Sequence, residues 1–156
     1  MTKTLLDTSI LIKLLNSSEE SGDVEKLLVE LKEDGGLFIN PIIYSELSVY
    51  FEEKQVLDSF LDETGIKLES IGEEACFEAG EKFSNYIENR SERLQCPECG
   101  GENTIDCRKC GKKLSFRQHI TPDFLIGSHA KNQADRLATI DEDFHKRYFK
   151  KLEVVN

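Results

Sequence analysis

Short apolar segments alternate with helical segments along most of this chain, and this alternation restricts the fold more than any other feature. The apolar segments expected as buried strands are residues 3–6, 37–39, 66–68, 137–140 and 152–155. The segments expected as helices are residues 9–15, 23–34, 41–54, 56–63, 73–94, 123–131 and 143–148. Because strands separated by helices favour a parallel sheet with helices packed on its faces, we expect an α/β fold.

Several helix boundaries can be predicted from the local sequence. Asn40 and Thr121 each precede a proline, a pattern typical of a capping residue followed by the first residue of a helix. Thr8 or Ser9 is available to cap the helix that follows the first strand. Glycine stops the 23–34 helix at residues 35–36, since glycine is common just past a helix end.

Four of the five cysteines lie close together, in the pattern C-x2-C-x7-C-x2-C. They are Cys96, Cys99, Cys107 and Cys110, and each pair is followed by a glycine. Four thiolates at this spacing favour one tetrahedral zinc ion in a closed, structural site. The alternative for such pairs is a redox or disulfide function, which is less common in cytosolic proteins. We therefore expect a small inserted four-cysteine zinc module at residues 95–118, with Cys76 as a separate core residue in a helix.

The charge limits the classes of partner. The chain has 30 acidic and 20 basic residues, a formal net charge of −10, which argues against broad, nonspecific coating of nucleic acid. An enzyme that holds cations in an acidic pocket remains compatible with it. No apolar run approaches the roughly 20 residues of a membrane span, and the N-terminus lacks the apolar segment of a signal peptide. We expect a cytoplasmic protein without membrane contact.

Four carboxylates stand out by position. Asp7 and Asp141 directly follow predicted strands, whereas Glu46 and Asp123 lie early in predicted helices. In an open parallel sheet, strand ends and the starts of the following helices share one edge, where ligands bind. Carboxylates gathered there repel one another unless a cation compensates, and oxygen ligands suit Mg²⁺ or Mn²⁺. Taken singly, Asp123 could instead stabilise the helix dipole, and Asp141 could cap the last helix.

The segments that contain these acids resemble the PIN-domain nucleases, with VapC-type toxins as the most similar group. The resemblance rests on Leu5-Leu6-Asp7-Thr8-Ser9, on Asn40-Pro41 through Glu46, on Thr121-Pro122-Asp123 and the helix after it, and on Leu137-Ala138-Thr139-Ile140-Asp141-Glu142-Asp143-Phe144. It covers nearly the whole chain apart from the cysteine segment. It implies a three-layer α/β/α domain over residues 1–156 with a central parallel sheet, interrupted by the zinc module.

The resemblance also implies a function and a site. The chain would be a metal-dependent endoribonuclease of a toxin–antitoxin pair, with RNA as substrate and with an antitoxin and a second copy as partners. Asp7, Glu46, Asp123 and Asp141 would bind Mg²⁺ or Mn²⁺, with Ser9, Thr139 and Asp143 supporting them. His129 is expected on a helix surface. Two alternatives are a PIN nuclease of ribosomal RNA maturation and a non-catalytic adaptor that binds RNA or protein through its zinc module.

Overall fold

Five parallel strands form the centre of the fold. The structure, a computed structural model, describes residues 1–16, 21–89, 93–95, 102–114 and 120–156. The strand order is β3-β2-β1-β8-β9, and every neighbouring pair is parallel. The bounds are Thr2–Leu6 for β1, Gly35–Ile39 for β2, Lys67–Leu68 for β3, Arg136–Ala138 for β8 and Glu153–Val155 for β9. The predicted α/β fold with a central parallel sheet is therefore confirmed.

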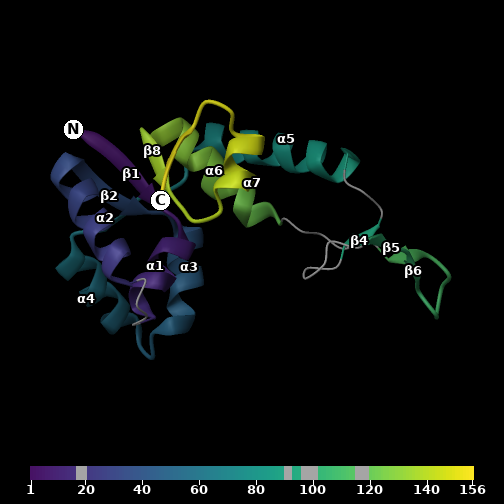
Figure 1. Ribbon diagram of the computed structural model, residues 1–156, viewed down its shortest axis with the longest axis horizontal. Coiled ribbons are helices and arrows are strands. Elements are labelled where there is room, and N and C mark those ends of the chain that lie inside the picture. Colours follow the sequence, from purple (N-terminus) through teal and green to yellow (C-terminus); the bar gives the residue numbers. More distant parts are fainter. Residues whose placement is uncertain (17–20, 90–92, 96–101, 115–119) are drawn as a thin grey trace.

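Helices cover both faces of this sheet. They are α1 (Thr8–Leu15), α2 (Ser21–Asp34), α3 (Pro41–Leu47), a 3-10 turn (Ser48–Tyr50), α4 (Lys54–Thr64), α5 (Glu73–Asn89), α6 (Thr121–Gln133) and α7 (Glu142–Tyr148). Helices α1 to α4 gather on one side of the strands and α5 to α7 on the other (Figure 1). This arrangement follows from right-handed crossovers, because the chain moves from β1 through β2 to β3 and then returns past β1 to β8 and β9.

Two apolar clusters hold these layers together. The larger one surrounds the central strands, where Leu5, Phe38 and Leu137 are at most 2% exposed. The smaller one joins α5, α6 and α7 and is built around the rings of Phe124 and Phe144, whose centroids lie 5.2 Å apart. Burial of aromatic and aliphatic side chains on both faces is the main stabilising contribution expected for such a sheet.

Some helix boundaries differ from the predicted ones. Asp7, rather than Thr8 or Ser9, caps α1, since its carboxylate accepts from the backbone N–H of Thr8 at 2.8 Å. Ile120 is the N-cap of α6, so Thr121 is already its first residue. Helix α3 ends at Leu47, several residues earlier than expected, and continues only as a 3-10 turn.

Two short hairpins occupy the part of the chain where the cysteine module is expected. Strands β4 (Leu94–Gln95) and β5 (Glu102–Asn103) pair antiparallel, and so do β6 (Ile105–Asp106) and β7 (Lys113–Leu114). The long helix therefore ends before residue 94. Figure 1 shows β4, β5 and β6 away from the sheet, beyond the end of α5. Cys96 and Cys99 lie outside the described residues.

Two single-residue predictions are wrong. Cys76 is exposed, because the buried face of α5 is formed by its neighbours Ala75 and Ala79. His129 is fully buried, and its ring contacts that of Phe38 at a centroid distance of 5.6 Å. In the part of the chain that the structure describes, no helix is both long and apolar enough to cross a membrane.

Candidate active site at the carboxyl edge of the sheet

Asp7 is the residue on which the candidate site is built. It follows β1, and its backbone N–H donates to the carbonyl of Ala138 at 2.9 Å, which fixes it beside the end of β8. Its Oδ2 accepts from the hydroxyls of Ser9 and Thr139, each at 2.6 Å. With Thr8 donating to Oδ1, this carboxylate is 9% exposed and held by three donors from two separate segments of the chain.

Thr139 connects Asp7 to the other carboxylate that follows a strand. It is fully buried, and its Oγ1 donates to Asp7 while accepting from the backbone N–H of Asp141 at 3.1 Å. Ser9 lies on the same network, since its Oγ is 3.3 Å from Thr139 Oγ1 and accepts from the N–H of Ile140 at 3.2 Å. The two hydroxyls therefore orient the Asp7 carboxylate.

Glu46 reaches this edge from α3. Asn40 caps that helix, its Oδ1 accepting from the N–H groups of Ile42 and Ile43 at 3.0 Å each. The half-buried Glu46 carboxylate accepts a hydrogen bond from the hydroxyl of Thr8, the residue next to Asp7. This link between α1 and α3 was not predicted, because it depends on how two helices pack; the only local signal is a hydroxyl adjacent to Asp7.

The electrostatics show that three of the four acids share one neighbourhood. Burial raises the pKa of Glu46, and the negative charges of Asp7 and Asp123 raise it further, while the hydrogen bond from Thr8 opposes the change. Among the described residues, no lysine or arginine is a cause of this shift. Repulsion between these carboxylates is the condition that a bound cation would relieve.

Asp123 and Asp141 also act as local caps. Asp123 lies in the first turn of α6, and its Oδ2 accepts from the N–H of Ile120 at 2.8 Å. Asp141 is exposed and caps α7, with Oδ1 accepting from the N–H of Phe144 at 3.4 Å. Asp143 is exposed in the first turn of α7, and the described hydrogen bonds around Asp7 do not include it.

The four carboxylates are chemically suitable ligands for a hard cation, but in this structure they are hydrogen-bonded to different partners. Within the described residues, no three His, Cys, Asp or Glu side chains are grouped so that they could hold a metal ion. Glu46 is turned to a hydroxyl, and Asp123 and Asp141 to backbone N–H groups. Carboxylate oxygens are the ligands of Mg²⁺ or Mn²⁺, and both ions commonly keep water molecules between themselves and part of their ligands.

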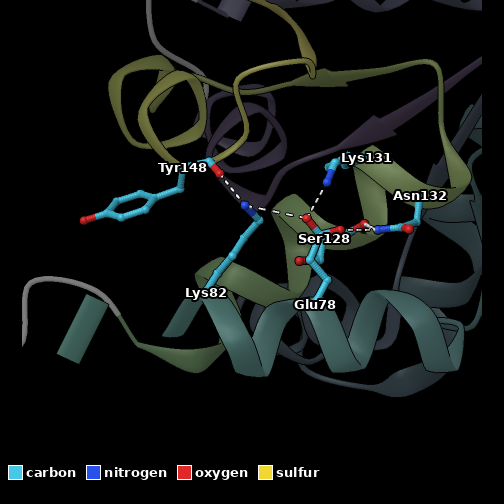
Figure 2. A network of polar contacts seen from close by, with 6 residues as sticks. All are labelled: Glu78, Lys82, Ser128, Lys131, Asn132 and Tyr148. Carbon is cyan, nitrogen blue, oxygen red and sulfur yellow. Dashed lines mark hydrogen bonds and ion pairs between the residues drawn. The ribbon is translucent and has the colours of Figure 1, made fainter. Parts of the chain in front are cut away.

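A polar network fixes α6 against α5 and α7 (Figure 2). Glu78 on α5 accepts from Asn132 at 2.8 Å and pairs with Lys131 and, at 3.6 Å, with Lys82. Lys82 also donates to the carbonyl of Tyr148 at 2.7 Å. Burial alone would raise the pKa of Glu78, but hydrogen bonds from Lys131 and Asn132 and the two lysine charges lower it below its ordinary value. The helix that contributes Asp123 is thus anchored at its other end.

Solved structures with a similar fold include two VapBC structures. One is VapBC2 from Rickettsia felis, bound to a DNA fragment from its promoter, with 19% identity and a TM-score of 0.64 over 99% of this chain and 98% of that chain. Another is VapBC-1 from nontypeable Haemophilus influenzae, with 15% identity and a TM-score of 0.63 over 99% and 97%. VapC20 from Mycobacterium tuberculosis, a toxin that cleaves the sarcin-ricin loop, shares 13% identity and a TM-score of 0.55 over 96% and 98%.

The sequence itself also matches a protein family. No curated protein was found to match the chain. The family model described as the PIN domain matches residues 4–94, more than half of the 156 residues, in a span that includes Asp7 and Glu46. At these identities the solved structures show a shared fold, and the family model agrees with that fold. The chain therefore belongs to the PIN domain family.

Proposed function

We propose that this protein is a metal-dependent endoribonuclease whose site is formed by Asp7, Glu46, Asp123 and Asp141. The observation that carries the proposal is the Asp7 carboxylate at the end of β1, held by Ser9 and Thr139 and facing other acids. Such a site, at the edge where parallel strands end, is where ligands of this fold class bind. Membership of the PIN family supports the same chemistry.

In this proposal, the carboxylates would hold Mg²⁺ or Mn²⁺, which when bound would supply charge neutralisation at the scissile phosphate and activation of water for attack. Asp7 would be a direct ligand, because Ser9 and Thr139 already fix the direction of its oxygens. Glu46 and Asp123 would turn from their present donors toward the cation, since their mutual repulsion falls when it binds. Asp141 and Asp143, both exposed, would hold outer water molecules.

RNA cleavage by single variants tests the proposed site. With Mn²⁺ or Mg²⁺ present, the wild-type chain is expected to cleave a structured RNA, and Asp7→Asn to lower the rate about 100-fold or more, because a metal ligand and its charge are lost. Asp62→Asn is the matched control, since Asp62 is exposed on α4 outside the site. Equal cleavage by wild type and Asp7→Asn contradicts the site, and tight RNA binding without turnover contradicts the nuclease.

We propose further that the enzyme is a toxin inhibited by an antitoxin protein. Support comes from the fold shared with the toxin chains of VapBC complexes over nearly the full length. Expression of the wild-type chain is then expected to arrest bacterial growth, expression of Asp7→Asn is not, and co-expression of a cognate antitoxin is expected to restore growth. Growth arrest by the Asp7→Asn variant at equal protein level would contradict a toxicity that depends on cleavage.

A further inference from the structure

The described side chains of the β6–β7 hairpin, residues 103 to 113, form almost no apolar interior. From residue 103 to residue 113 every side chain is exposed except that of Cys107, and Ile105 is 50% exposed. Each strand contributes only two residues. Because an isolated two-stranded hairpin is at best marginally stable in water, burial alone does not account for this hairpin. A further stabilising interaction is required.

The turn of the hairpin is shaped around Cys107. The Cys107 N–H donates to the carbonyl of Lys112 at 2.7 Å, and the Gly111 N–H donates to the carbonyl of Cys107 at 2.8 Å. Gly111 has a φ of 69°, in the left-handed region that glycine adopts without strain. These bonds fold the chain back immediately after Cys110, so both cysteines lie at the tip of the same hairpin.

Donors from the turn are directed at the Cys107 sulfur. The hydrogen-bond donors near this sulfur are the backbone N–H groups of Cys110 and Lys109 and the thiol of Cys110. The two thiols are therefore neighbours on the same turn. Both cysteines are free thiols in the structure. Two thiols on one tight turn, with backbone N–H groups near a sulfur, are the kind of arrangement that supplies half of the ligands in a four-thiolate metal site.

We propose that Cys107 and Cys110 are two ligands of a structural zinc ion that stabilises the hairpin. The sequence predicts Cys96 and Cys99 as the other two ligands, and variants of that pair test the prediction separately. Zinc is the appropriate cation, because it accepts soft thiolate ligands in tetrahedral geometry and undergoes no redox change. On binding, each ligand thiol releases its proton to solvent.

Nearby charges favour the same assignment. Four thiolates around one divalent zinc leave an excess of two negative charges, by simple addition of formal charges. Four cationic residues lie within three positions of the two described cysteines in sequence, against one acid, Asp106, and all of these side chains are exposed: Arg108, Lys109, Lys112 and Lys113. Their charges offset the excess without entering the metal site. The proposal is independent of the nuclease function, because none of these residues belongs to the carboxylate edge.

Metal analysis of the purified full-length chain tests the proposal. We expect about one zinc per chain in the wild type, and loss of that zinc in the double variant Cys107→Ser/Cys110→Ser. Cys76→Ser is the matched control, because this exposed cysteine on α5 lies outside the hairpin and its variant should keep the zinc. Full zinc content in the Cys107→Ser/Cys110→Ser variant would overturn the assignment of these ligands.

Three further measurements make the test of the zinc ligands decisive. Replacement of zinc by Co²⁺ should give the sulfur-to-cobalt charge-transfer absorption of thiolate ligation; a wild-type chain that binds neither metal and instead contains a Cys107–Cys110 disulfide overturns the proposal. Far-UV circular dichroism should show the α/β core still folded in the double variant, so that zinc loss is not a result of global unfolding. Cys96→Ser/Cys99→Ser should also lose zinc, and full retention there would exclude the four-thiolate set.

Discussion

At the scale of single residues, Asp7 joins two functions that are usually separate. The same carboxylate caps α1 and faces the acidic edge, so the folding of the first β-α connection already orients it. Thr139 contributes from the end of β8, 132 residues away in sequence. The Asp7 carboxylate is therefore held by three hydrogen bonds, whereas the Glu46 carboxylate accepts one described hydrogen bond, from the hydroxyl of Thr8.

Replacing Glu46 by Gln is expected to stabilise the protein at neutral pH. The pKa of Glu46 is raised, so between the ordinary glutamate pKa of about 4.3 and the raised value the folded state binds more protons than the unfolded state, and stability falls as the pH rises. The substituted glutamine side chain cannot ionise and can still accept from Thr8. The expected gain is no more than about 1 kcal/mol, because the carboxylate is only half-buried.

Urea unfolding in buffer free of divalent cations checks this expectation. The gain of Glu46→Gln over wild type should be present at pH about 7.5 and vanish near pH about 3, well below the ordinary glutamate pKa, where Glu46 is protonated in both states. Glu63→Gln, at an exposed position on α4, should show no comparable gain at neutral pH. A Glu46→Gln variant that is less stable than wild type at neutral pH would contradict the repulsion described above.

Individual site residues differ in how far the sequence can predict them. Asp7 and Asp141 follow predicted strands, so the period of the apolar pattern and the geometry of parallel sheets place them at one edge, whereas Thr139 was expected at the site only through the family resemblance. The contact of Thr8 with Glu46 depends on the packing of two helices, which no local pattern encodes. His129 was predicted at the surface because it is polar, but residues 126–130 are all buried, so α6 has no solvent face there.

At the scale of elements, α6 is held by close contacts as well as by the network around Glu78. Gly127 faces Phe149, and a Cβ added there would lie 2.2 Å from Cε2 of that ring. Gly127→Ala is therefore expected to lower the free energy of unfolding by about 1–3 kcal/mol, the usual cost of overpacking. Gly80→Ala, on exposed α5 with no atom within 4 Å of the added Cβ, should instead raise it by about 0.5–1 kcal/mol.

Chemical denaturation of the two glycine variants measures this difference in sign. Both substitutions replace glycine by alanine inside a helix, so their helix propensities change equally and only the surroundings differ. An unchanged stability for Gly127→Ala would mean that the Phe149 ring moves aside at no cost, which would contradict close packing between α6 and the segment after α7.

Element ends were less predictable than element types, since α3 ends in a 3-10 turn and α5 ends before the hairpins.

At the scale of the whole molecule, the chain has two parts with different sources of stability. The five-stranded sheet is stabilised by buried apolar side chains on both faces, and the alternation of strands and helices predicted that it is parallel but not the order of its strands. Between residues 103 and 113 the structure shows no such burial, so the fold of this segment could not be predicted from hydrophobic periodicity, and only the cysteine spacing identified it. The net charge of −10 is compatible with RNA as a substrate if a cation occupies the carboxylate edge.

The central claim is that the carboxylates around Asp7 bind a divalent cation, and titration of Mn²⁺ into the full-length chain tests it most directly. Electron paramagnetic resonance reports free Mn²⁺, and thiolates are poor ligands for this ion, so the cysteine segment should not interfere. The wild type and Asp62→Asn should bind Mn²⁺ alike, and Asp7→Asn should bind it at least about tenfold more weakly. Equal binding by Asp7→Asn, or no binding by the wild type, would contradict the claim.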